Sequence, residues 1–203
     1  MLEQQLAAAR VLPVVTARDE ATTVELAAAL LRGGMRVIEI TLRTPAALAA
    51  IAAVQEAVPG MVVAAGTVNT PADVERVAAA GVKLALSPGA TPALLEAAAE
   101  APLDFVPGVA SASELMQARS WGFSVFKLFP AEAAGGIALL KALGGPFPEA
   151  RFCPTGGLTP ANFRHYLALD NVICCGGSWM VTTELVENGR WDDIQRLAAD
   201  AMA

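Results

Sequence analysis

The chain has only three lysines, and one of them, Lys127, lies inside an apolar run. That run covers residues 121–130 and is typical of a buried strand ending at Pro130. Burying a charged ammonium is costly, because apolar surroundings favour the neutral amine. Since a neutral amine attacks carbonyl carbons, Lys127 is a candidate nucleophile toward a keto acid. A lysine that extends to the rim of a sheet would give the same pattern.

A carboxylate and a guanidinium share one face of another predicted strand, because Glu39 and Arg43 are spaced at even intervals. If this face and that of Lys127 both point into one interior, Glu39 and Lys127 flank a common cavity. A carboxylate beside an amine can relay protons for carbinolamine formation, dehydration and C–C cleavage. Glu39 could instead form a buried ion pair that holds strands together. Arg43 suits a substrate carboxylate, or else lies on the surface where the next helix starts.

Two glycine-rich loops follow the last two predicted strands. They are Thr155-Gly156-Gly157 and Gly176-Gly177-Ser178. Glycines let backbone N–H groups close around an anion, so two such loops on neighbouring strands indicate a phosphate site. We expect a short helical turn, Trp179–Thr182, to aim its N-terminus at the same point.

These residues must be positioned by a repeating α/β pattern, in which eight β-rich runs alternate with Ala- and Leu-rich helical runs. The repeat implies parallel strands, closed as a (β/α)8 TIM barrel or open as a doubly wound sheet. Even unit lengths and the absence of a nucleotide fingerprint favour a barrel, preceded by an extra N-terminal helix, Leu2–Arg10. We expect a single domain over residues 1–203. The predicted strands are Val11–Thr16, Val37–Thr41, Met61–Ala65, Leu84–Ser87, Asp104–Val106, Ser124–Phe129, Arg151–Thr155 and Val172–Cys175.

Threonine or serine caps, most of them followed by proline, predict where several helices begin. In such a barrel the chemistry lies at the carboxyl ends of the strands, just before these caps. The capped helices are Ala46–Ala57 after Thr44, Ala72–Ala80 after Thr70, Ala93–Glu100 after Thr91, Ala112–Trp121 after Ser111 and Ala161–Leu169 after Thr159.

Composition excludes several classes of protein. With 55% hydrophobic and 17% charged residues, the chain is too apolar for disorder. No apolar run reaches the roughly 18 residues of a membrane helix, and the N-terminus does not resemble a signal peptide. A net charge of −6 argues against nucleic acid as a partner. Three cysteines suggest a reducing cytoplasm, and the single histidine argues against a histidine-based metal site.

The strand endings, taken together, resemble those of the 2-keto-3-deoxy-6-phosphogluconate (KDPG) aldolases, which also act on 4-hydroxy-2-oxoglutarate. The resemblance covers nearly the whole predicted barrel, in order. The matching stretches are Gly34–Thr44, Ala65–Val68, Ser87–Gly89, Pro107–Val109, Phe126–Glu132, Arg151–Gly157 and Cys175–Trp179.

The resemblance implies a class I aldolase that cleaves KDPG to pyruvate and D-glyceraldehyde 3-phosphate in the Entner–Doudoroff pathway. It implies a homotrimer with a phosphorylated keto acid as substrate, and neither metal nor cofactor. Lys127 would form the Schiff base, and Glu39 would be the general acid/base. The other implied contacts are Arg43 and Thr67 with the pyruvate carboxylate, Phe129 beside the imine, Thr155 with a substrate hydroxyl, and Gly156, Gly157, Gly177 and Ser178 with the phosphate.

The chain also departs from the family. Some members carry an arginine at the end of the first strand that reaches the phosphate, whereas this chain has Thr16 there and Arg18 two residues later. A sister group cleaves the galactonate epimer, but stretches 42–44 and 154–157 favour the gluconate enzyme. Two other functions fit the same barrel. A phosphosugar isomerase or epimerase would share the phosphate site without needing Lys127, and a non-catalytic barrel would bind phosphate without turnover.

Overall fold

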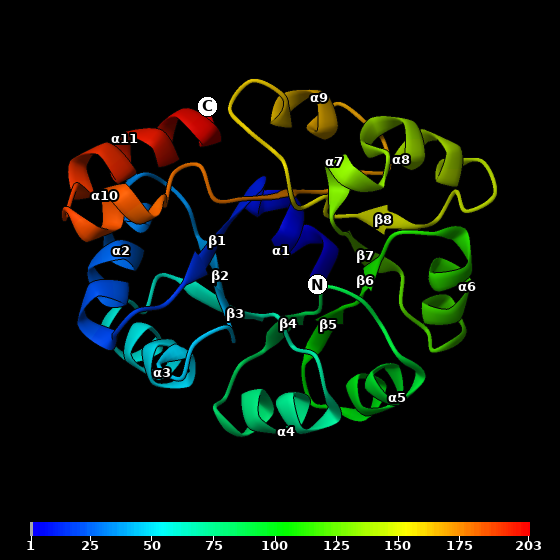
Figure 1. The fold of residues 1–203 in the computed structure, drawn as a ribbon, viewed down its shortest axis with the longest axis horizontal. Coiled ribbons are helices and arrows are strands. Elements are labelled where there is room, and N and C mark those ends of the chain that lie inside the picture. The colour runs from blue at the N-terminus through cyan, green and yellow to red at the C-terminus, as the bar shows by residue number, and fades with distance from the viewer. Residues whose placement is uncertain (1) are drawn as a thin grey trace.

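Parallel strands form a closed ring surrounded by helices in the computed structural model, which describes residues 2–203 (Figure 1). The molecule is the predicted (β/α)8 barrel. Its strands are β1 Val11–Thr16, β2 Val37–Thr41, β3 Val62–Gly66, β4 Leu84–Leu86, β5 Asp104–Val106, β6 Gly108–Val109, β7 Val125–Leu128, β8 Arg151–Phe152 and β9 Cys175–Gly177.

The strands pair in two arcs, β5-β4-β3-β2-β1-β9 and β6-β7-β8, and every pairing is parallel. The arcs join at both ends. On one side, β5 and β6 are consecutive segments divided only by Pro107, which has no N–H to donate to a ladder. On the other side, parallel bridges link Phe152 to Val172 and Thr155 to Gly176. The ring is therefore closed, which rules out the open doubly wound sheet.

The helices lie outside this ring, except the first, which lies across its centre in this view (Figure 1). They are α1 Leu2–Ala9, α2 Glu20–Arg32, α3 Ala47–Ala57, α4 Pro71–Ala79, α5 Pro92–Glu100, α6 Ala112–Ser120, α7 Ala131–Ala134, α8 Gly136–Gly144, α9 Phe163–Leu167, α10 Thr183–Glu187 and α11 Trp191–Met202.

The predicted helix caps are confirmed at α4, α5 and α6. The hydroxyls of Thr70, Thr91 and Ser111 each accept a hydrogen bond from the backbone N–H three residues later. Each of them adopts an extended backbone conformation, as a residue that precedes the first helical turn should.

Two predicted caps are wrong. The hydroxyl of Thr44 donates to the backbone carbonyl of Ala17 at 2.7 Å, and α3 starts one residue later than predicted, behind Ala46. The backbone N–H of Thr159 donates to the side chain of Asn162 at 2.8 Å, so this segment forms a turn, and α9 starts only at Phe163. In both places another local or tertiary hydrogen bond replaces the cap.

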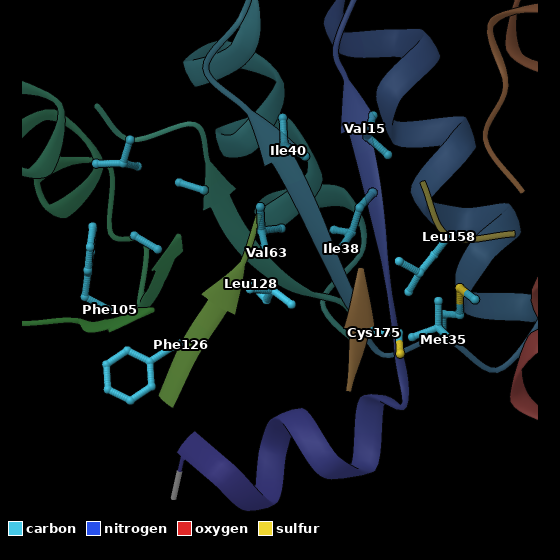
Figure 2. Close-up of a cluster of buried hydrophobic side chains, with 14 of the residues drawn as sticks. Val15, Met35, Ile38, Ile40, Val63, Phe105, Phe126, Leu128, Leu158 and Cys175 are labelled. Atoms are coloured by element: carbon cyan, nitrogen blue, oxygen red, sulfur yellow. The ribbon is translucent and has the colours of Figure 1, made fainter. Parts of the chain in front are cut away.

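The hydrophobic core has two layers. The outer layer lies between strands and helices and includes Ile38 and Ile40 of β2 and Leu128 of β7 (Figure 2). The inner layer joins alternate strand residues to Leu6 and Ala9 of α1, which closes the amino-terminal end of the barrel. Polar side chains on the inward faces of the strands are therefore confined to the carboxyl end.

The start of α4 is expected to make stability depend on pH. Asp73 accepts hydrogen bonds from the backbone N–H groups of Asn69 and Thr70, both at 3.0 Å, and pairs with Arg76. Burial raises the pKa of Asp73, but the hydrogen bonds from Arg76, the backbone N–H of Asn69 and the Thr70 side chain together hold the pKa below its ordinary value. A lowered pKa contributes stability that is complete above the unfolded-state pKa and is lost as pH falls through the folded-state pKa.

An Asp73→Asn variant should therefore be less stable than the wild type at pH 7, by on the order of 1 kcal/mol. The difference should shrink as pH falls below about 4, because the unfolded-state carboxylate becomes neutral there and the folded-state carboxylate follows at lower pH. Denaturant unfolding of both proteins at pH 7 and pH 3 measures it. Asp170→Asn, which removes an exposed carboxylate outside any helix, is the control. An equal difference at both pH values would contradict the prediction.

Candidate active site

The predicted meeting of Lys127 and Glu39 is confirmed. Phe126 and Leu128, on either side of Lys127 in β7, both belong to the outer layer (Figure 2). Because strand side chains alternate, the Lys127 side chain points to the opposite face, into the barrel. Its Nζ lies 2.8 Å from Oε1 of Glu39 on β2, and the two residues are only 4% and 0% exposed. The other two lysines are exposed, so Lys127 is the one buried amine among residues 2–203.

The second carboxylate oxygen of Glu39 is also buried, and no donor among residues 2–203 reaches it. A buried acceptor without a partner is costly, and an ion pair this deep contributes little net stability. An ion pair with only a structural role would therefore link β2 to β7 at a high desolvation cost and with little net gain in stability. The arrangement suits a site in which Glu39 accepts a proton or a hydrogen bond from a bound molecule.

Two glycines at close approaches lie on the strands that pair with β2 and β7. A Cβ added at Gly66 of β3 would overlap the Glu39 carboxylate. Gly108 of β6, the register partner of Lys127, lies so close to the backbone of Pro88 that a Cβ would overlap it. Neither glycine was predicted from the sequence to have a role at the site. The available signal was a glycine at the end of a strand, which often marks a close approach.

A cavity of about 660 Å³ opens at the carboxyl ends of the strands. Phe129 connects it to the buried pair, because its ring centroid lies 5.6 Å from Lys127 Nζ. Lys127 and Glu39 are not among the lining residues. The predicted site residues that line the cavity are Arg43, Phe129, Thr155, Gly156, Gly157, Gly177 and Ser178.

The loop after β8 depends on glycine for its path. Gly156 and Gly157 have φ angles of +101° and +81°, which favour glycine over other residues. Gly176 of β9 makes space for Thr155, since a Cβ there would overlap the threonine hydroxyl. Thr155 is thereby buried to 5% exposure while still reaching the cavity wall.

The predicted helical turn at Trp179–Thr182 is wrong. These residues form a turn, in which the N–H of Val181 donates to the carbonyl of Ser178 at 3.1 Å, and α10 begins only at Thr183. The indole of Trp179 folds back over Gly177, where a Cβ would overlap the ring. Ser178 therefore enters the cavity wall from a turn and not from the N-terminus of a helix.

Thr67 is the predicted substrate-binding residue that does not line the cavity. It lies half-buried immediately after β3, with a φ of +58°. This conformation is uncommon for a β-branched residue and typically costs about 1–3 kcal/mol. Such strain is concentrated at functional sites, so Thr67 remains a candidate on the side of the barrel that holds Glu39.

Two arginines line the cavity and differ in their partners. Arg43 is exposed and makes no hydrogen bond or ion pair with any residue of the described chain, so its guanidinium is available to an anion. Arg18 pairs with Glu187 of α10, which also lines the cavity. Arg18 must therefore leave or share Glu187 before it can bind a ligand.

The three cysteines and the histidine, whose side chains could also be reactive, are not assigned to the site. Cys153, Cys174 and Cys175 are buried free thiols, and burial raises the pKa of Cys175 well above its ordinary value. His165 is exposed on α9. Residues 2–203 contain no cluster of three or more His, Cys, Asp or Glu side chains suited to a metal ion. Within the same range, no helix is long and apolar enough to cross a membrane.

A buried lysine–carboxylate pair beside a cavity at the carboxyl end of a (β/α)8 barrel is the arrangement of a class I aldolase. The model of one protein family, KDPG and KHG aldolase, matches residues 2–197. KHG is 2-keto-4-hydroxyglutarate, another name for 4-hydroxy-2-oxoglutarate. The chain belongs to the KDPG and KHG aldolase family.

Individual relatives match over nearly their whole length. The 2-dehydro-3-deoxy-phosphogluconate aldolase of Pseudoalteromonas atlantica is 48% identical over 193 residues, which are 95% of this chain and 90% of the relative. The KHG/KDPG aldolase of Escherichia coli K12 is 46% identical over 200 residues, covering 98% and 94%.

The fold also matches solved structures. A KDPG aldolase from Legionella pneumophila, crystallised with pyruvate captured at low pH as a covalent carbinolamine, superposes with a TM-score of 0.95. It is 44% identical and covers 98% of this chain and 97% of its own. A native KDPGal structure at 23% identity, with a TM-score of 0.82 over 94% of this chain and 91% of its own, shares the barrel fold alone.

Proposed function

We propose that this family member cleaves KDPG to pyruvate and D-glyceraldehyde 3-phosphate through a Schiff base on Lys127, and that it also acts on KHG. The observation that carries the proposal is the Lys127–Glu39 pair, with Nζ and Oε1 2.8 Å apart in the barrel interior. The covalent carbinolamine in the Legionella relative supports the class of intermediate.

In the first half-reaction Nζ of Lys127 attacks the keto carbon, C2. Across these steps Glu39 carries two protons to the former keto oxygen from the nitrogen, which starts as the ammonium of the ion pair. The oxygen leaves as water, which gives a protonated iminium ion and restores the Glu39 carboxylate. The carboxylate then removes the proton of the C4 hydroxyl. The C3–C4 bond breaks, its electron pair moves into the iminium as an enamine, and glyceraldehyde 3-phosphate departs. Protonation at C3 and hydrolysis release pyruvate and regenerate the amine.

The cavity residues are assigned to binding. Arg43 has no ion-pair partner among residues 2–203, and we assign it, with Thr67, to the pyruvate carboxylate. Phe129 forms the wall beside the imine, and Thr155 contacts a substrate hydroxyl. The phosphate is assigned to the residues Gly156, Gly157, Gly177 and Ser178.

Kinetics on two epimeric substrates test the proposed specificity. The kcat/KM for KDPG should exceed that for its galactonate-derived epimer, because stretches 42–44 and 154–157 resemble the gluconate enzymes. The reverse preference would assign the chain to the galactonate group. Isomerisation or epimerisation of a phosphosugar without formation of pyruvate would overturn the proposal altogether.

Ser178 should affect binding more than chemistry, because the phosphate lies far from the C3–C4 bond. Ser178→Ala should raise KM for KDPG roughly tenfold with little change in kcat, and should leave KHG, which has no phosphate, almost unaffected. Steady-state kinetics on both substrates measure the effect. Ser124→Ala, which removes an exposed hydroxyl where β7 begins, is the control. Equal damage to both substrates would show that Ser178 is not a phosphate ligand.

We further propose that each chain, as one domain over residues 1–203, assembles into a homotrimer in the cytoplasm and uses no cofactor. The family resemblance supports the trimer, and three free cysteines support a reducing compartment. Exposed apolar side chains such as Met116 and Trp121 of the α6 region are available for an interface. Sedimentation equilibrium at micromolar concentration should give three times the 20.9 kDa chain mass. A monomer would contradict it.

A further inference from the structure

The loop after β8 is held by the chain that follows β7. The backbone N–H of Ala131 donates to the carbonyl of Thr155 at 2.8 Å, and that of Glu132 donates to the carbonyl of Gly156 at 3.1 Å. The first residues of α7 thus continue the pairing of β7 with β8 beyond the ends of both strands. The side chain of Glu132 lies against Gly157, where a Cβ would come within 2.7 Å of its Cβ and Cγ.

The carboxylate of Glu132 joins this loop to α9. Oε1 accepts hydrogen bonds from the hydroxyl of Tyr166 and, at 3.5 Å, from the side-chain amide of Asn162. The same amide donates to the carbonyl of Gly157 at 3.3 Å. The ring of Tyr166 is almost fully buried, so the hydroxyl is a fixed anchor. Burial and the Glu132 carboxylate both raise the pKa of Tyr166 well above its ordinary value, so this hydroxyl keeps its proton and donates.

We propose that Glu132, anchored by Tyr166 and linked to Asn162, is a positioning residue that sets the geometry of the Gly156-Gly157 loop for substrate phosphate. The inference rests on the proposed placement of phosphate at the loops after β8 and β9. Both glycines have positive φ and no side chain of their own, so outside contacts must define the orientation of their N–H groups. Glu132 and Asn162 supply two of those contacts, both at Gly157.

The direction of the change in KM for KDPG distinguishes a positioning role of Glu132 from a simple effect of its charge. A carboxylate near a phosphate dianion repels it, so removing that charge alone should strengthen phosphate binding and lower KM. If Glu132 instead holds the loop in a binding geometry, removing the side chain should weaken phosphate binding and raise KM. Glutamine, which keeps an oxygen able to accept from Tyr166, should rescue most of the loss.

Steady-state kinetics of Glu132→Ala and Glu132→Gln on KDPG and KHG test the proposal. Glu132→Ala should raise KM for KDPG about fivefold or more, with a smaller rise for Glu132→Gln and little change for KHG. Asn162→Ala reaches the same loop without removing a charge and should act in the same direction. Because both side chains act on one loop, the double variant should lose less than the product of the single losses. Glu149→Ala, an exposed carboxylate before β8, is the control.

Ser178→Ala, measured beside these variants, distinguishes failure of the positioning role from failure of the phosphate placement. If it weakens KDPG selectively while Glu132→Ala and Asn162→Ala do not, the positioning role is wrong and the phosphate placement stands. A fall in KM for KDPG in Glu132→Ala would also overturn the positioning role. If none of the variants discriminates between the substrates, the phosphate placement fails and the inference fails with it.

Discussion

Lys127→Ala is expected to lose nearly all turnover of KDPG and KHG while keeping the fold. The barrel interior offers no second buried amine within residues 2–203, so no other side chain there can replace the nucleophile. Removing the covalent route should lower kcat by several orders of magnitude, since the remaining cavity contributes only binding and orientation. Rates under saturating substrate, with circular dichroism to verify folding, measure the loss.

Borohydride reduction in the presence of pyruvate tests the same assignment directly, by trapping the Schiff base on the lysine that forms it. The wild type should gain a single adduct on Lys127, located by peptide mass spectrometry, and Lys127→Ala should gain none. Lys141→Ala, which removes an exposed amine of α8, is the matched control and should be labelled like the wild type. An adduct on Lys83 or Lys141 of the wild type would refute the assignment.

Glu39→Gln is expected to have the second largest effect. The amide keeps the size of the side chain and an oxygen facing Lys127, but it cannot take up a proton. Because Glu39 is assigned to proton transfers in the transition states, kcat and kcat/KM should fall together by about 10²–10⁴-fold. The loss should be similar for KDPG and KHG, in contrast to variants of the phosphate loops.

The outcome also decides between catalysis and structure for the ion pair. If Glu39 only joined β2 to β7, its glutamine variant would unfold at a different denaturant concentration but retain kcat. Glu149→Gln controls for the lost charge, since Glu149 is exposed and lies before β8. A rise in KM alone would identify Glu39 as a binding group and contradict its role in proton transfer.

The part of this architecture that sequence reasoning predicted follows from short-range periodicity. Alternation along β2 and β7 placed Glu39 and Lys127 on inward faces, and parallel pairing placed their ends together, so their contact could be expected. Hydrophobic runs and capping residues located the strands and most helices, because those signals depend on neighbours within a few residues.

What sequence reasoning missed depends on contacts between distant segments. Thr44 is a residue type that commonly caps helices, but its hydroxyl bonds to the carbonyl of Ala17 instead. Nothing in the neighbouring sequence distinguishes a capping threonine from one that makes such a distant hydrogen bond. Glu132, the last residue of the stretch Phe126–Glu132, acquires its role only when α9 brings Tyr166 to it across the fold. The space that Gly66 leaves for Glu39 likewise depends on strand register, which spacing along one strand does not reveal.

The glycines beside Glu39 and Thr155 make the residues tolerated at positions 66 and 176 depend on those at positions 39 and 155. Any residue larger than glycine at 66 would collide with the Glu39 carboxylate, and one at 176 would collide with the Thr155 hydroxyl. A lineage that keeps the acid cannot accept a side chain at 66, whereas a lineage that has lost the acid is released from that constraint. A larger side chain at 66 should therefore be tolerated better in a chain that has also lost the Glu39 carboxylate.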